Sequence, residues 1–171
     1  MNESAVQSMR KSPFKIVAGG QTGVDRAALD WAIAQRVRHG GWCPKGRRAE
    51  DGIIPRRYRL KETRSPAYNV RTRWNVRESD GTLIISANHL IVGGTKLAAE
   101  FAESLKKPLL HLTMTTGTRR AARQLDRFIA RHGIHVLNIA GPRDSEEPGI
   151  KQFAQDLLTR SRLLASAGQR R

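Results

Sequence analysis

The amino-acid sequence predicts a Rossmann-like α/β fold, a three-layer α/β/α sandwich around a mainly parallel central sheet. Short apolar runs alternate with segments whose apolar residues recur at helical spacing, which is the pattern of consecutive parallel βαβ units. Two glycine-rich turns, at residues 19–23 and 93–95, each follow a predicted strand and open a predicted helix. The chain has 171 residues, of which 39% are hydrophobic, so it is long enough for one domain with a buried core.

The first half of the chain begins with one strand and one helix. Residues 14–18 form an apolar run that ends in glycine, so we expect a buried strand there. A helix is expected over residues 22–37, because apolar residues recur at helical spacing and glycines follow them. Residues 41–76 are rich in Arg, Gly and Pro, and we expect a long functional loop region with short strand-like pieces around Trp42 and residues 58–60.

Regular elements follow one another in the second half. The expected strands are residues 82–86, 109–112 and 134–139. The expected helices are residues 95–106, 118–131 and 145–164. Pro108 ends the first of these helices because proline interrupts helical hydrogen bonding, and Gly133 suits the C-cap of the second. The helix over 118–131 is amphipathic, with its inward residues at Ala121, Ala122, Leu125, Phe128 and Ile129.

We expect a single Rossmann-like domain over residues 13–164, a flexible tail over 1–12 and a basic flexible tail over 165–171. The end of the chain from residue 160 holds four arginines and no acid, and is expected to fray. No apolar run approaches the roughly 20 residues that a membrane span requires, and the N-terminus shows no signal-peptide pattern. The single cysteine, Cys43, excludes an internal disulfide, favours a reducing cytoplasm and is expected to be a small buried residue.

Positive charge is the most pronounced bulk property. The formal net charge is +16, and residues 36–77 carry 13 basic residues against three acidic ones. A field of one sign on this scale attracts anions and raises their encounter rate. Nucleotides, phosphorylated cofactors and nucleic acid all remain open as partners at this point.

The first glycine-rich turn is the strongest local signal for a binding site. Gly19, Gly20 and Gly23 allow the backbone to turn sharply and approach a ligand, and the helix that follows offers free N–H groups to a phosphate. Gln21 lies inside the same turn, and Thr22 is placed to cap the helix or to donate its hydroxyl.

Asp25 and Arg26 follow in the first turn of this helix, next to whatever binds there. The pattern is neither the GxGxxG dinucleotide fingerprint nor a Walker A loop. A tight strand–helix connection without a ligand is therefore the alternative interpretation.

The second glycine-rich turn favours the ligand interpretation. Gly93, Gly94 and Thr95 open a helix shortly after the strand that ends at Ser86, and we include all four residues in the site. Both turns of a parallel sheet lie at the same edge, so they could hold one phosphorylated ligand from two sides. Thr95 is also a suitable N-cap, and Lys96 is either a phosphate contact or a solvated residue.

A basic loop at residues 41–48 supplies further candidates. Lys45 and Arg47, with Gly46 as a hinge between them, could close over an anion, and the alternative is a solvated run of charge. Trp42 and Trp74 could stack on a flat ring, although in a chain with 5% aromatic residues a core position is the simpler expectation.

The sequence predicts no catalytic residue and no metal site. The five histidines show no ligand spacing with each other or with the cysteine, and no nucleophile elbow is present. Asp25, Asp80, Glu100 and Asp144 could each act as an acid or base, but the sequence places no partner beside any of them. We therefore expect a binding protein rather than an enzyme.

Several blocks, taken together and in order, resemble the molybdenum cofactor carrier protein family. The likeness covers roughly residues 14 to 160, which makes it more specific than any one motif. The matching blocks are residues 18–30, 41–47, 50–55, 62–63, 68, 71–72, 75–76, 80–84, 93–95, 137–143 and 148–150.

The resemblance implies a Rossmann-like fold of the SLOG superfamily, a homo-oligomer and molybdenum cofactor (molybdopterin) as cargo. A hydrolase or sensor of nucleotides or NAD derivatives is the first alternative. Related phosphoribohydrolases carry PGGxGTxxE, whereas Glu100 here stands five positions after Thr95, so the catalytic spacing is not met. Nucleic-acid binding through residues 36–77 is the second alternative, and it predicts an affinity that falls steeply with salt.

Overall fold

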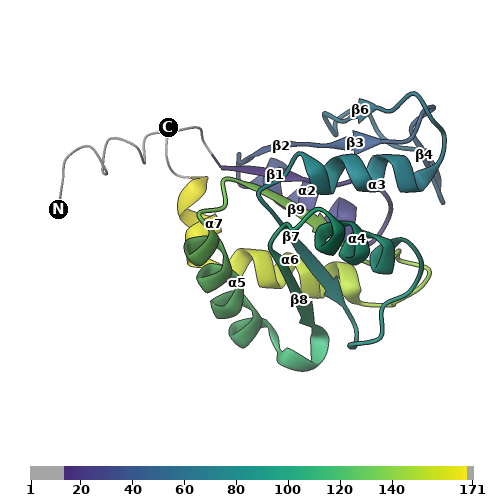
Figure 1. Ribbon diagram of the computed structural model, residues 1–171. Coiled ribbons are helices and arrows are strands. Elements are labelled where there is room, and N and C mark those ends of the chain that lie inside the picture. Colours follow the sequence, from purple (N-terminus) through teal and green to yellow (C-terminus); the bar gives the residue numbers. More distant parts are fainter. Residues whose placement is uncertain (1–13, 169–171) are drawn as a thin grey trace.

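The computed structural model describes residues 14–168 (Figure 1). The tail expected at 1–12 and the last three residues of the tail expected at 165–171 lie outside the described residues. None of the helices in the described range is long and apolar enough to cross a membrane.

A sheet of five parallel strands forms the centre of the molecule, as predicted. Its strands are β1 (Lys15–Val17), β2 (Arg38–Gly40), β7 (Gly81–Ser86), β8 (Leu109–Thr113) and β9 (Val136–Ala140). They lie in the order β2-β1-β9-β7-β8, so the last strand of the chain enters the middle of the sheet. The register pairs Ile16 of β1 with Leu137 of β9, and Leu83 of β7 with Ile139 of β9. All four of these side chains are fully buried because helices cover both faces.

Helices form the two outer layers of the sandwich. They are α2 (Val24–Ala34), α3 (Tyr68–Arg77), α4 (Gly93–Ser104), α5 (Thr118–His132), α6 (Ile150–Arg160) and α7 (Arg162–Ala167). The pair α3 and α4 packs together on one face, while α2, α5, α6 and α7 pack on the other (Figure 1). The three-layer α/β/α architecture is therefore confirmed.

The segment between β2 and α3 forms two small accessory sheets. The strands β3 (Trp42–Cys43) and β6 (Lys61–Glu62) pair in parallel. The strands β4 (Arg48–Ala49) and β5 (Gly52–Ile53) form an antiparallel hairpin. Ile54, Tyr58 and Leu60 from this segment pack with Ala18 and Leu29 in a second small core beside the end of β1.

The sequence did not predict β2, α3 or the β4–β5 hairpin. Residues 38–40 were expected to follow a longer helix, but α2 ends at Ala34 and β2 pairs with β1. A three-residue edge strand that begins with an exposed arginine gives no apolar pattern. Residues 41–76 were expected to have little regular structure, yet they contain most of α3, whose buried residues Thr72 and Asn75 are polar and hide its amphipathic periodicity.

Several boundaries also differ from the expectation. The closing helix expected at 145–164 is two helices, because the extended backbone of Ser161 separates α6 from α7. Helix α7 covers part of the segment that was expected to fray. Residues 58–60 are not a strand, and β6 begins directly after them. Gly133 adopts the left-handed conformation with a φ of 58°, as expected of a C-cap.

Candidate functional site

The carboxyl ends of the parallel strands bring three connections together. Residues 18–23 follow β1, residues 141–149 follow β9, and residues 87–92 follow β7. Because β9 lies between β1 and β7, the two glycine-rich turns share one edge but do not stand on neighbouring strands. The helix after β9 covers one face of the sheet and the helix after β7 covers the other. The space between the carboxyl ends of β9 and β7 is therefore a topological switch point, and α/β proteins bind ligands at such points.

The first glycine-rich turn is buried by the protein itself. Gly20 has a φ of 82°, and a β carbon there would lie 2.6 Å from Cδ1 of Leu60. Gly23 has a φ of 77°, and its β carbon would collide with the carbonyl oxygen of Pro142 in the connection after β9. The glycines are thus required by packing between segments of this chain.

Gly19 lies directly against a guanidinium that the site prediction did not include. A β carbon on Gly19 would collide with Nη1 of Arg71, a residue of α3. Nη1 of Arg71 also donates to Oδ2 of Asp25 over 3.2 Å, and the Asp25 side chain is 4% exposed. Burial raises the pKa of Asp25, while the charge of Arg71 and hydrogen bonds from the Gln21 and Gly19 backbones oppose that rise.

A carboxylate from the β4–β5 hairpin joins the first turn to the connection after β9. The Thr22 hydroxyl donates to Oε1 of Glu50, and the Ser145 hydroxyl donates to Oε2 over 2.6 Å. Oε1 of Gln21 accepts hydrogen bonds from the backbones of Thr22 and Glu50. The hydrogen bonds from Ser145 and Thr22 lower the pKa of Glu50, so the carboxylate is charged at neutral pH.

Arg26 is likewise engaged within the protein. Its Nε donates to the carbonyl oxygen of Gly20 over 3.1 Å, and its two terminal nitrogens form a bidentate pair with Asp51. The hydrogen bond from Arg26 lowers the pKa of Asp51. Arg26 and Asp51 therefore hold the hairpin against the first turn.

The second glycine-rich turn is open. Gly93 is the first residue of α4 rather than a residue before it, and Gly94 and Thr95 complete its first turn. Gly93 and Gly94 are exposed, and a β carbon added to either would meet no atom within 4 Å. No side chain caps the helix at Val92, and within residues 14–168 the backbone N–H groups of these three residues form no hydrogen bond. Unpaired N–H groups at a helix N-terminus are a favourable place for an anion.

Ser86 closes the loop that leads to this turn. It is fully buried, its hydroxyl donates to the carbonyl oxygen of Asn88 over 2.6 Å, and its oxygen lies 2.6 Å from Nε2 of His111 on β8. Because that hydroxyl has one hydrogen, Nε2 of His111 donates to Ser86. Burial lowers the pKa of His111, and its neighbour His89 acts in the same direction. Ser86 therefore shapes the loop and does not face solvent.

The two cations of the basic loop, Lys45 and Arg47, differ: the first is exposed and the second is held in place by hydrogen bonds. Lys45 is exposed, and Gly46 donates its backbone N–H to Glu62. The guanidinium of Arg47 donates to four backbone carbonyl oxygens, those of Ile54, Pro55, Tyr58 and Leu60. Arg47 thus holds the segment that covers the first turn, and it has little freedom to close over a ligand.

Three residues outside the predicted site add to its charge and shape. The ring of Tyr68, the first residue of α3, lies 6.0 Å from the guanidinium of Arg71 and 5.7 Å from that of Arg143. Arg143 follows β9 and has no ion pair within the described residues. All three lie in segments that supported the family resemblance, but only the fold brings the start of α3 beside the end of β9.

Two buried donors in this region have no partner among the described residues. They are Nε2 of Gln21 and Nε of Arg71. Nε of Arg71 would lie 2.9 Å from a β carbon on Gly19, and Gln21 is two residues further along the same turn. Buried donors are almost always paired, so each is a position where an acceptor would be stabilised.

The remaining candidates have structural surroundings. The rings of Trp42 and Trp74 pack edge to face with centroids 4.6 Å apart, and Nε1 of Trp42 donates to Glu78. Cys43 is buried, and burial raises the pKa of its thiol. The described residues contain no group of three or more His, Cys, Asp or Glu arranged to hold a metal ion.

Comparisons with known proteins agree with this architecture. A crystal structure named "Putative molybdenum carrier protein", from Syntrophus aciditrophicus SB, has 46% sequence identity and a TM-score of 0.85, over 90% of this chain and 99% of that chain. A solved structure of (E)-4-hydroxy-3-methyl-but-2-enyl diphosphate reductase matches at 13% identity over 92% of this chain and 63% of that one, with a TM-score of 0.37, which is too low to bear on fold or function. A search of curated proteins found no match. Residues 16–162 match the circularly permutated YpsA SLOG family. With nearly all of the Rossmann-like domain inside that match, the chain belongs to this family.

Proposed function

We propose that the protein is a carrier that binds a phosphorylated small molecule at the carboxyl edge of the sheet, and that its cargo is molybdenum cofactor. The observation that carries the proposal is the open first turn of α4. Gly93, Gly94 and Thr95 there present unpaired backbone N–H groups in a positive helix-terminal field. The name of the Syntrophus protein supports molybdenum cofactor as the ligand.

Other groups at the same edge of the sheet fit a phosphorylated ring system. Arg143 and Arg71 carry positive charge at the same edge, beside the ring of Tyr68. The unpaired donors on Gln21 and Arg71 would suit carbonyl or phosphate oxygens. In this proposal the phosphate binds at the second glycine-rich turn, and the first turn, which is buried, holds the surrounding side chains in place.

A carrier fits this geometry better than a hydrolase. Asp25 is buried in an ion pair with Arg71, and Glu100 is exposed and lies 3.7 Å from Lys96. Neither carboxylate has the partner or the setting expected of a catalytic base. The homo-oligomer implied by the family resemblance stays a prediction.

The test uses Gly94, because the space around it is empty. A β carbon at Gly94 would meet no atom within 4 Å, so Gly94→Val adds bulk in open space beside the proposed phosphate position. Ala130→Val is the matched control, since Ala130 is an exposed helical residue on α5. Purified proteins are incubated with molybdenum cofactor, and bound pterin and molybdenum are quantified after gel filtration.

We expect stoichiometric pterin and molybdenum on the wild type and on Ala130→Val, and at least about tenfold weaker binding by Gly94→Val, because the lost contacts are charge-assisted. Equal binding by all three proteins would place the phosphate elsewhere. Absence of binding by the wild type would reject molybdenum cofactor as cargo, and a panel of nucleotides and NAD derivatives, assayed for binding and base release, would follow.

A further inference from the structure

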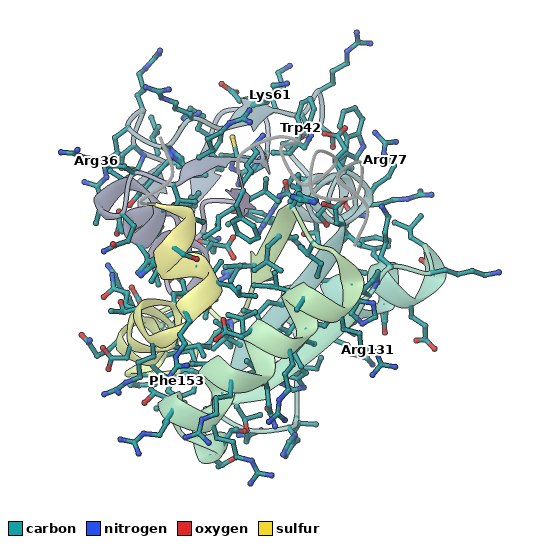
Figure 2. The ribbon with its side chains drawn as sticks, turned by 90° about the vertical axis from the view of Figure 1, so that its left-hand side faces the viewer. Arg36, Trp42, Lys61, Arg77, Arg131 and Phe153 are labelled. Atoms are coloured by element: carbon teal, nitrogen blue, oxygen red, sulfur yellow. The ribbon has the colours of Figure 1, made fainter. Side chains whose placement is uncertain are left out.

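A row of arginines covers the exposed side of α5, on the outer face of the molecule. Arg119, Arg123 and Arg127 recur at every fourth position, so they share one side of the helix and stand about 6 Å apart along its axis. Arg160, at the end of α6, and Arg162, at the start of α7, lie on the other side of a groove. Figure 2 faces this side of the molecule, where nitrogen-tipped side chains surround α5.

The groove is hollow, and six of its twelve lining residues are arginines. Two adjoining hollows of about 590 Å³ and 570 Å³ share Arg119, Arg123 and Arg127. The other lining residues are small or polar, with one acid among them: Thr116, Gly117, Thr118, Ala122, Gln124 and Asp126. The surface is therefore a positively charged channel rather than an apolar docking site.

The one carboxylate in the groove is already engaged. Asp126 accepts from the Ser161 hydroxyl over 2.6 Å and from the backbone N–H groups of Arg162 and Leu163, so it caps α7. Within residues 14–168, no ion pair or hydrogen bond involves the guanidinium groups of the groove-lining arginines: Arg119, Arg120, Arg123, Arg127, Arg160 and Arg162. Asp126 keeps its negative charge, so the six arginines leave the lining with a formal surplus of five positive charges.

The start of α5 gives a second, independent observation. Arg119 and Arg120 stand in its first turn, where no acid is present and where no side chain caps the helix at Gly117. Cations at a helix N-terminus oppose the helix dipole and destabilise the helix. An external anion at this end would reverse the penalty, because the free N–H groups and both guanidiniums would then bind it.

We propose that the groove along α5 binds the phosphate backbone of double-stranded nucleic acid without sequence preference. The row from Arg119 to Arg127 spans roughly 12 Å, which is longer than one phosphate group and suits a run of them. No aromatic residue lines the groove, so single strands would find no stacking platform. The apolar side of α5 is buried in the core, so the helix has no face to insert into a membrane.

The surface differs from the basic segment at residues 36–77, where the sequence suggested nucleic-acid binding. Several arginines there have partners inside the protein, such as Arg47 with four carbonyl oxygens and Arg71 with Asp25. Three others, Arg56, Arg64 and Arg73, are exposed and form no ion pair or side-chain hydrogen bond in the described part of the chain. They provide a matched control for charge alone.

The experiment compares two triple charge reversals that lower the net charge equally. The groove variant is Arg119→Glu, Arg123→Glu and Arg127→Glu, and the control variant is Arg56→Glu, Arg64→Glu and Arg73→Glu. Anisotropy of labelled DNA and RNA duplexes of about 24 base pairs is measured between about 50 mM and 200 mM salt. A parallel sample tests vesicles that contain an anionic lipid.

We expect the wild type to bind a duplex, and the groove variant to bind it at least about tenfold more weakly than the control variant does. The slope of log K against log salt should decrease by about 2 to 3 in the groove variant, since each lost phosphate contact removes about one unit. Thermal unfolding checks that each variant is folded, and a triple Gln variant of the groove, which avoids new repulsion, should weaken binding in the same direction.

Three results would overturn the proposal. If the groove and control variants lose equal affinity for the duplex, the loss reflects the lower net charge of the protein and not the groove. If the groove variants bind the duplex as tightly as the wild type does, the duplex contacts another surface of the protein. Binding of anionic vesicles by the wild type, without binding of either duplex, would assign the surface to a membrane.

Discussion

The guanidinium of Arg71 on α3 lies 3.2 Å from the carboxylate of Asp25 on α2, across the end of β1. The two helices belong to opposite layers of the sandwich, so the pair joins both layers at the candidate site. The side chains are 14% and 4% exposed, and Gly19 leaves the space that the guanidinium occupies. A buried ion pair is costly to assemble, and removing one partner leaves the other charge uncompensated.

Replacement of Arg71 by Met should therefore strongly destabilise the protein. We expect a loss of about 3–5 kcal/mol in the free energy of unfolding, measured by urea denaturation. Adding Asp25→Asn should recover part of this loss, because the buried carboxylate is then neutral. A double-mutant cycle without coupling between the two positions would show that the pair does not stabilise the fold.

The two glycine-rich turns should respond oppositely to alanine. Gly23→Ala places a β carbon against the carbonyl of Pro142 at a φ of 77°, and we expect a loss of more than about 2 kcal/mol. Gly94→Ala meets no atom and replaces glycine in a helix, so it should be neutral or stabilising by up to about 1 kcal/mol. Similar melting temperatures for both variants would contradict the burial of the first turn.

Glu50 should control how tightly the β4–β5 hairpin is held. Its carboxylate accepts from Thr22 and Ser145, and Glu50→Ala would remove both hydrogen bonds. We expect faster amide hydrogen exchange at residues 48–53 in this variant than in the wild type. Arg48→Ala, in the same hairpin but without a side-chain hydrogen bond in residues 14–168, serves as the control and should leave exchange unchanged.

His111 should make stability depend on pH. Burial lowers its pKa from the usual 6.5, so the unfolded chain binds a proton more readily than the folded protein does. The contribution of His111 is fully present above about pH 6.5 and is lost as the pH falls towards its folded pKa. Burial also lowers the pKa of His39. The pH dependence of wild-type stability therefore contains contributions from both histidines.

His111→Gln isolates this effect, because an amide can still bond to Ser86 but does not titrate here. The melting temperature of the variant should fall less than that of the wild type between about pH 7 and pH 5. If the melting temperatures of the two proteins fall equally between these pH values, groups other than His111 cause the pH dependence of stability.

Local patterns determined most of the fold. The buried strand β7 contains the apolar run of residues 83–85, and α5 places an apolar residue at every position that packs inward, so both follow from local sequence patterns. The edge strand β2 and the helix α3 do not. Most of their residues are polar or charged, and they are stabilised by contacts with β1, β3 and α4 that are distant in sequence.

The sequence by itself determined the family, the parallel sheet and the presence of glycine-rich turns at its carboxyl edge. The tertiary structure alone decided how those turns differ. Gly20 and Gly23 are buried by Leu60 and Pro142, whereas Gly94 stands in open space. It also decided which charges are available: Arg47 and Arg71 are engaged by partners inside the protein, and the arginines of α5 are not. Residue type sets what a side chain can do, but burial and partners depend on segments that only folding brings into contact.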